Sequence, residues 1–344
     1  MERISQINFG QVSGKTIVET TMCNRNGMTV SSCTYGATIT KLLVPDRHGG
    51  FENIVCSFPS VEGYRNNPQF FGATIGPFAG RLENAEIQMG DIDYKVQPNE
   101  GAHLLHGGDQ GFHQVIWNVS TTQTSDASST QYKCVFNSDY PGEITMTVTM
   151  TLNDANELSI SYVGTSTEDT LLNCTNHTYF NLSGNLKRTV HEHRLTLPAP
   201  FYIPITKQGL PMGQYEAVLG TLFDFREGNL LRNVIGAKNG QIDYASGGLD
   251  HPFIVNGQPI ELYDAESGRK MVILSEDQAV VVYTGNKIGS NFEFTEAPAQ
   301  NFLGVCLEEQ NVPNSSLYSH FPSSFLSKNE QYNKKTIYRF TWNH

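Results

Sequence analysis

Residues 144–152 read Ile-Thr-Met-Thr-Val-Thr-Met-Thr-Leu, with apolar and polar side chains in unbroken alternation. Because successive side chains of a β-strand point to opposite faces, this pattern predicts a strand that is buried on one face only. Residues 156–163 (Asn-Glu-Leu-Ser-Ile-Ser-Tyr-Val) repeat the pattern a few positions later. The middle of the chain therefore predicts β-structure with one buried face.

Strand-like segments recur along the whole chain, whereas helical periodicity is almost absent. Apolar or alternating runs occupy residues 15–20, 28–35, 36–46, 87–96, 270–275, 278–284 and 336–342, with turn signals at Asn26-Gly27 and Gly90-Asp91. A short helical turn is expected at residues 61–64, and the Ser/Thr-rich residues 120–131 are expected to form a long hairpin loop. Short strands with frequent turns and no clear linker predict an all-β antiparallel sandwich or barrel, in a single domain over residues 1–344.

Composition limits the classes of partner. The 344 residues carry a formal net charge of −11, whereas binding to nucleic acid or an anionic membrane surface requires a basic face. No run of about 18 apolar residues is present and residues 1–5 do not begin a secretory signal, so we expect no membrane partner. The six cysteines are scattered without a C-x-x-C pair, which favours reduced thiols and a cytoplasmic location. A monomer and a homodimer both remain open.

One polar stretch stands out among the strands. Residues 173–184 read Asn-Cys-Thr-Asn-His-Thr-Tyr-Phe-Asn-Leu-Ser-Gly, follow a short apolar run and end in a turn signal. This order predicts a strand that brings His177 to its end, in a polar setting. Histidine exchanges a proton near neutral pH, which makes His177 a candidate acid or base. The alternative is a core histidine that donates to a backbone carbonyl.

Four other stretches place ionisable side chains, which could transfer protons or bind a polar ligand, next to glycines or apolar runs. They are residues 72–81 ending in Arg81, 103–108 with His106, 247–253 with Asp250, and 305–310 with Glu308 and Glu309. Each also has a plain structural alternative, namely a surface arginine, a loop histidine, a turn aspartate, or two solvated acids at a strand end. Of the two adjacent acids, one is expected to face inward, where desolvation raises its pKa and makes it a better base.

Neither a metal nor an organic cofactor is expected. His103 and His106 in an extended segment would point in different directions, and no further Cys or His is spaced to complete a zinc set. The chain has no G-x-S-x-G nucleophile motif and no phosphate-binding loop of the Walker or Rossmann kind. The histidines, carboxylates and arginine together favour proton transfer on a polar, uncharged ligand.

Taken in order along the chain, these stretches resemble the aldose 1-epimerase (galactose mutarotase) family. The most specific match is Thr-Asn-His-Thr-Tyr-Phe-Asn-Leu-Ser-Gly at residues 175–184. Further matching blocks lie at residues 36–39, 44–46, 72–81, 105–108, 111–112, 117, 220–226, 249–251, 283–286 and 307–310. The resemblance covers nearly the whole chain.

The resemblance implies a large antiparallel β-supersandwich and an enzyme that interconverts the α and β anomers of a free aldose without a cofactor. It implies that Glu308 is the general base for the anomeric hydroxyl and that His177 is the general acid for the ring oxygen. It further implies that the sugar is held by His106, which shares in catalysis, and by Arg81, Asp250, Asn176, Tyr179 and the positions of Gly80 and Val281.

The protonation states that this chemistry needs can be compared with reference values. Glu has a reference pKa of about 4.3 and His of about 6.5. An ionised Glu308 and a protonated His177 are therefore expected together mainly between these two pH values, with a window that widens if a neighbouring acid raises the pKa of His177.

Two positions depart from the family pattern. Family members often have Asn where this chain has Gly80, and many have Gln where it has Val281. Both losses leave the preferred sugar open and predict loose discrimination between sugars. The alternatives are a reducing disaccharide such as maltose, a hexose 6-phosphate, a sugar-binding protein without turnover, and a glycosidase with two carboxylates about 5–10 Å apart.

Overall fold

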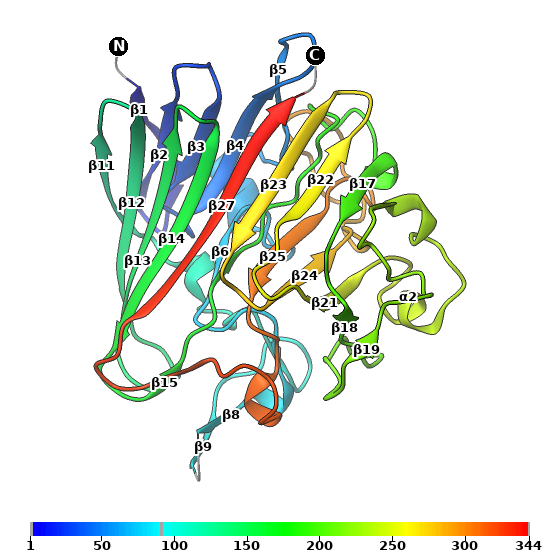
Figure 1. The fold of residues 1–344 in the computed structure, drawn as a ribbon. Helices are drawn as coiled ribbons and strands as arrows, with labels where there is room; N and C mark the ends of the chain where they lie inside the picture. Colours follow the sequence, from blue (N-terminus) through cyan, green and yellow to red (C-terminus); the bar gives the residue numbers. More distant parts are fainter. Residues whose placement is uncertain (1–2, 90–91, 343–344) are drawn as a thin grey trace.

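The computed structural model describes residues 3–89 and 92–342. Antiparallel strands dominate, which confirms the all-β prediction (Figure 1). Within the described residues the only α-helices are α1 (Val61–Arg65), where a short turn was expected, and α2 (Gly240–Tyr244). Single 3-10 turns are η1 (Glu83–Ala85), η2 (Phe112–Gln114), η3 (Val190–Glu192), η4 (Leu231–Asn233) and η5 (Ser315–Leu317).

The largest layer is a nine-stranded sheet that contains the alternating segments. Its strands, in spatial order, are β11 (Asn118–Gln123), β12 (Ala127–Phe136), β13 (Ile144–Asn153), β14 (Glu157–Ser166), β27 (Tyr332–Trp342), β23 (Arg269–Ser275), β22 (Ile260–Asp264), β17 (His193–Thr196) and β20 (Asn229–Leu230). In β13 every second side chain is fully buried, as its sequence predicts.

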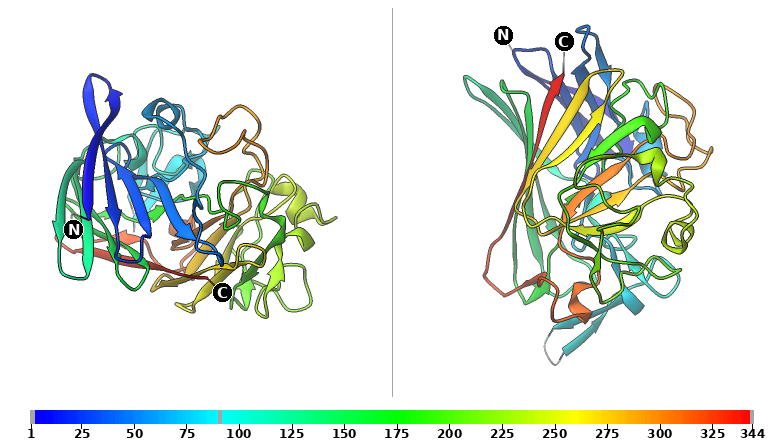
Figure 2. Two further views of the ribbon diagram at one scale, coloured as in Figure 1. Left: turned by 90° about the horizontal axis from the view of Figure 1, so that it is seen from above. Right: turned by 45° about the vertical axis from the view of Figure 1, so that its right-hand side comes forward.

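Two five-stranded sheets pack against this layer (Figures 1 and 2). The first consists of β1 (Ile4–Val12), β2 (Lys15–Cys23), β3 (Thr29–Cys33), β4 (Thr38–Pro45) and β5 (Phe51–Asn53). The second has the order β19 (Glu216–Ala217), β18 (Phe201–Tyr202), β21 (Asp250–Ile254), β24 (Ala279–Tyr283) and β25 (Cys306–Gln310). The main apolar cluster runs through all three sheets and includes residues from Met22 to Phe340.

Short two-stranded pairs lie outside these three sheets. They are β6 (Thr74–Ile75) with β16 (Thr175–Asn176), β7 (Arg81–Leu82) with β10 (Leu104–Leu105), β8 (Glu86–Met89) with β9 (Ile92–Lys95), and β15 (Thr170–Leu171) with β26 (Phe325–Leu326). The strands β16 and β10 of the first two pairs end directly before residues 177 and 106, so these pairs position the histidines expected in the site.

The expected loop at residues 120–131 is wrong, because β11 and β12 take up most of it and only residues 124–126 lie between them. The Ser and Thr side chains suit a strand because they pair across the sheet, as Ser129 Oγ does with Thr151 Oγ1 at 2.8 Å. The turn expected at Gly90-Asp91 lies outside the described residues. In the part of the chain that the structure describes, no helix has the length and apolar character needed to cross a membrane.

Candidate active site

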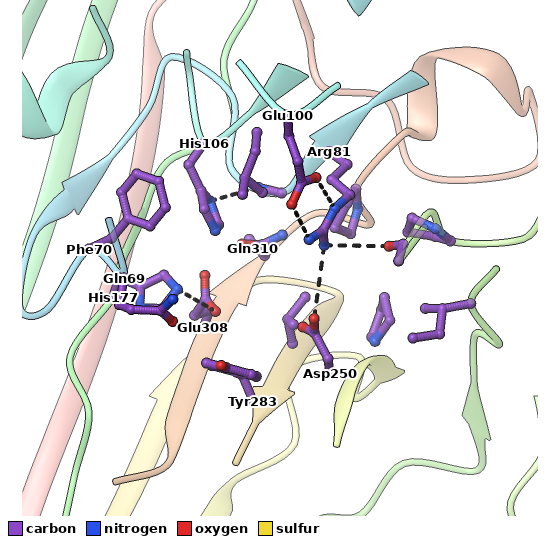
Figure 3. Close-up of a pocket in the computed structure, with 18 of the residues that line it drawn as sticks. Gln69, Phe70, Arg81, Glu100, His106, His177, Asp250, Tyr283, Glu308 and Gln310 are labelled. Carbon is purple, nitrogen blue, oxygen red and sulfur yellow. Dashed lines mark hydrogen bonds and ion pairs between the residues drawn. The ribbon is translucent and has the colours of Figure 1, made fainter. Parts of the chain in front are cut away.

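A single pocket beside β21, β24 and β25 gathers most of the residues singled out above (Figure 3). Its lining includes Gly80, Arg81, His106, His177, Tyr179, Asp250, Val281 and Glu308. The empty space of the pocket, its open mouth included, is about 850 Å³. Segments that are far apart in the sequence therefore meet at one place.

Backbone pairing on both sides holds His177 in place. The strand pair β6–β16 continues past its last residue, since His177 N–H donates to Ala73 O at 2.9 Å and Gly72 N–H donates to His177 O at 3.0 Å. The following segment bridges to the start of β25 through Phe180 and Val305. The imidazole is thereby fixed, and only 4% of His177 is exposed.

The alternation of β25 decides which acid faces the pocket. Cys306, Glu308 and Gln310 lie on one face of the strand, and Glu308 is the antiparallel partner of Val281 on β24. Glu309 points the other way into the core, where Tyr338 O–H donates to its Oε2 at 3.2 Å. Both acids are 2% exposed, so the solvated pair considered as an alternative does not exist.

His177 and Glu308 form a buried pair. His177 Nε2 lies 3.4 Å from Glu308 Oε1 (Figure 3), and in the described structure Glu308 Oε2 has no hydrogen-bond partner. A buried carboxylate oxygen without a partner is costly, and in this pocket it is available to a ligand hydroxyl.

Burial shifts both pKa values of the pair away from the reference values. Desolvation lowers the pKa of His177 to about 4 and raises that of Glu308 well above its usual range. The window between about 4.3 and 6.5 that reference values suggest therefore does not hold for the empty pocket. At neutral pH the imidazole is neutral, and burial favours the uncharged form of Glu308 as the holder of the proton that the two groups share.

His106 is held in one tautomer by its own loop. The backbone N–H of Gly80 donates to the ring atom His106 Nδ1 at 3.1 Å. The backbone N–H of His106 donates in return to Gly80 O at 3.0 Å. Burial lowers the pKa of His106 well below its usual range, so the ring is neutral and its proton must be on Nε2. His106 therefore presents a fixed hydrogen-bond donor to the pocket.

The same residues form the one group in the described chain with metal-like spacing. One ligand atom from each of His106, His177 and Glu308 lies within 4.8 Å of the others. A metal-binding histidine normally donates its second ring N–H to an acceptor. His106 has the opposite arrangement, because its Nδ1 accepts from Gly80 N–H and its Nε2 holds the proton. The donor set therefore fits a sugar oxygen better than a metal ion.

Arg81 is positioned by an acid that the sequence did not single out. Its guanidinium makes two hydrogen bonds to Glu100, at 2.6 and 2.9 Å, and Nη1 lies 3.9 Å from Asp250 Oδ2 (Figure 3). Desolvation raises the pKa of Asp250, while Arg81 acts in the opposite direction. The three side chains form one wall of the pocket with both donors and acceptors. Glu100 lies in a polar loop without a recognisable motif, so only the fold reveals it.

Of the two further residues expected to contact the ligand, Tyr179 lines the pocket and Asn176 does not. Asn176 lies outside the pocket lining, and its amide donates to Gly72 O at 3.0 Å and accepts from Thr178 Oγ1. Its hydrogen bonds therefore hold the loop before the pocket. The Tyr179 ring lines the pocket with its centroid 5.1 Å from that of His177, but its hydroxyl donates to Gln69 O at 2.9 Å.

The two departures from the family pattern have different structural consequences. Gly80 has φ +79°, and a Cβ there would lie 2.5 Å from Pro313 Cβ, so Pro313 already fills the space beside it. Val281 presents an apolar side chain next to Glu308. Gln310, which the sequence did not identify, brings a buried amide to the lining, and its Oε1 has no partner within the described structure.

Comparisons with known proteins show what this chain is similar to. A family model described as aldose 1-epimerase matches residues 19–339. Galactose mutarotase from Mus musculus is 31% identical over 348 residues, covering 99% of each protein. An aldose 1-epimerase from Haemophilus influenzae is 32% identical over 318 residues, covering 91% of this chain and 92% of that protein. The solved galactose 1-epimerase from Lactobacillus acidophilus superposes with a TM-score of 0.89 at 27% identity, covering 99% of both chains.

Proposed function

Because the chain belongs to the aldose 1-epimerase family, it interconverts the α and β anomers of free aldoses, and we propose that Glu308 and His177 carry the proton transfers. The observation that supports these roles is the buried contact of 3.4 Å between His177 Nε2 and Glu308 Oε1 at the pocket wall. An acid and a base that share one proton can act together on a single sugar.

The reactive form has the shared proton on His177 Nε2 and an ionised Glu308. Arg81 favours this form, because its charge lowers the pKa of Glu308 against the effect of burial. Hydroxyl groups of a bound sugar add donors to the carboxylate oxygen that has no partner in the empty pocket. Binding of the substrate therefore generates the working acid and base.

Ring opening needs two proton transfers. Glu308 takes the proton of the anomeric hydroxyl, a C1=O bond forms and the bond between C1 and the ring oxygen breaks, while His177 gives its proton to the ring oxygen. Rotation about C1–C2 presents the other face of the carbonyl, and closure with reversed transfers gives the other anomer. His106 donates to a sugar oxygen from its protonated Nε2, and Arg81 with Asp250 holds further hydroxyls.

Polarimetry on freshly dissolved α-glucose, α-galactose, xylose and maltose tests this function. The protein should accelerate the change in optical rotation, and His177→Asn should lower turnover by about 10²-fold or more. A wild-type rate equal to that of buffer alone would contradict the function.

The class of sugar follows from the pocket wall near Gly80 and Val281. We infer that Gln310 supplies the amide contact that is missing at Gly80, because its Nε2 would lie 3.4 Å from a Cβ at that position and its Oε1 is buried without a partner in the described structure. The space beside Gly80 contains Pro313, so the small residue offers no extra room for a disaccharide. The charge of Arg81 is matched by Glu100 and Asp250, which favours a neutral sugar over a hexose 6-phosphate.

Three wider properties complete the proposal. The chain acts as one domain, which the apolar cluster from Met22 to Phe340 supports. It works in the cytoplasm, a location that suits six free cysteines. Its proposed partner is a sugar, and it functions as a monomer or a homodimer.

A further inference from the structure

Cys306 contacts the nitrogen of His177 that faces away from Glu308. Cys306 lies two residues before Glu308 on the same face of β25, and its Sγ is 3.5 Å from His177 Nδ1. Cys306 is fully buried and His177 nearly so. Each nitrogen of the catalytic ring therefore has a partner on β25, one a carboxyl group and the other a thiol.

The thiol is neutral in this position. Burial raises the pKa of Cys306 well above its usual range, so the sulfur retains its hydrogen at neutral pH. A neutral thiol is a weak donor and a weak acceptor, and the geometry alone allows either role. The direction of the hydrogen bond depends on which nitrogen of His177 carries the proton of the neutral ring.

The proposed chemistry determines that direction. Nε2 must take the shared proton and release it to the ring oxygen, so in the neutral imidazole Nε2 has to be unprotonated. The remaining hydrogen is then on Nδ1, which requires an acceptor. Building on the proposed function, we propose that Cys306 is a positioning residue whose sulfur accepts from His177 Nδ1–H and holds Nε2 free for proton exchange.

The two histidines of the pocket then have opposite tautomers for opposite tasks. At His106 a backbone donor from Gly80 occupies Nδ1 and leaves a permanent donor on Nε2. At His177 a thiol acceptor occupies Nδ1 and leaves Nε2 to gain and lose a proton. A carboxylate in the place of Cys306 would also orient the ring, but its charge would stabilise the imidazolium and make it a weaker acid.

Nitrogen NMR of the histidine rings tests the tautomer without any turnover. In the 15N-histidine-labelled full-length protein at pH 7, the ring of His177, assigned by its absence in His177→Asn, should carry its proton on Nδ1. The ring of His106 should carry its proton on Nε2 and serves as the internal reference. A proton on Nε2 of His177 in the wild-type protein would overturn the proposal.

Substitutions provide the second arm of the test. Cys306→Ala should mix the tautomers of His177 and lower kcat by about 3- to 10-fold, the effect of one neutral hydrogen bond, with KM nearly unchanged. Cys306→Ser retains an acceptor and should restore both the spectrum and most of kcat. Cys56→Ala is the matched control, because Cys56 is a buried thiol of the same apolar cluster that forms no hydrogen bond with His177 in the described structure.

The outcomes separate this proposal from the proposed function. An unchanged spectrum and kcat in Cys306→Ala would overturn the positioning role even if the wild-type protein were a fast epimerase. A wild-type protein without turnover would contradict the function, while the ring spectrum would still decide the tautomer. If Cys306→Ala failed to fold, the wild-type spectrum and the Cys306→Ser variant would give the answer.

Discussion

Tyr338 on β27 donates a hydrogen bond of 3.2 Å to Glu309 on β25, and this contact fixes the direction in which the neighbouring Glu308 points. Because successive side chains of a strand face opposite sides, Glu309 in the core implies Glu308 in the pocket. Two glutamates that are adjacent in the sequence therefore lie in different environments, one in the pocket and one in the core.

Glu308→Gln should therefore abolish most of the activity, whereas Glu309→Gln should not. The amide retains the shape of Glu308 but cannot take a proton, so turnover should fall by about 10²-fold or more while sugar binding largely survives. Polarimetry gives turnover, and the dependence of rate on sugar concentration gives KM. The reverse result, with Glu309→Gln inactive and Glu308→Gln active, would show that the base is assigned to the wrong residue.

Stability should decline as pH rises toward about 8, and Glu309 should account for part of the decline. Burial raises its pKa from 4.5 to about 8, so the folded protein keeps a proton that the unfolded chain has lost between these values. The free energy of unfolding therefore falls as pH rises from about 4.5 to about 8, by on the order of a few kcal/mol. Urea unfolding at pH 6 and pH 9 measures this decline.

Glu309→Gln cannot ionise and should show a smaller loss of stability between pH 6 and pH 9 than the wild-type protein. Glu276→Gln is the control, because Glu276 is an exposed acid near the same sheet and its removal should leave the decline unchanged. Equal declines in the wild-type protein and Glu309→Gln would rule out Glu309 as the source.

Gly80→Ala should destabilise the fold more than an alanine at a glycine with open surroundings. The new Cβ would lie 2.5 Å from Pro313 Cβ, and the alanine would have to keep an unfavourable positive φ. Together these effects should lower the free energy of unfolding by about 1–3 kcal/mol. Gly220→Ala has a similar φ of +76° with nothing within 4 Å, so it isolates the backbone effect. Thermal unfolding of both variants tests the difference, and equal Tm values would mean that Pro313 moves aside.

Discrimination between sugars that differ at C4 should be loose, because Val281 provides no polar group. Glucose and galactose should react with kcat/KM values within about 10-fold of each other, since a site without a buried partner for one hydroxyl cannot strongly reject its epimer. Gln310→Leu should raise KM with a smaller effect on kcat, as loss of a binding contact does. A large preference of the wild-type protein for one epimer would point to a discriminating residue elsewhere.

The strand pattern made the fold predictable because alternation such as that of residues 144–152 is a local property. The resemblance to the family identified Glu308, His177, His106, Arg81 and Asp250, which the fold brings into one pocket. The same local reasoning failed at residues 120–131, because Ser and Thr are common both in loops and in strands that pair through their hydroxyls.

Other parts of the site depend on contacts between distant segments and left no local signal. Glu100 and Gln310 become meaningful only when Arg81 and Glu308 lie beside them. Asn176 belongs to the most specific motif, yet its amide serves the loop at Gly72. The raised pKa of Glu308 was expected for an inward-facing acid, but the lowered pKa of His177 was out of reach, since it arises from desolvation in the assembled pocket.

The two faces of β25 have different roles, and this constrains which sequence changes the enzyme can accept during evolution. The strand carries Glu308 toward the pocket and Glu309 toward the core, with Cys306 and Gln310 in step with Glu308. A point mutation changes one of these positions, but a one-residue insertion or deletion within the strand would exchange the two faces at once. Length changes should therefore be tolerated in the loop between β24 and β25 but be absent from residues 306–310 in functional descendants.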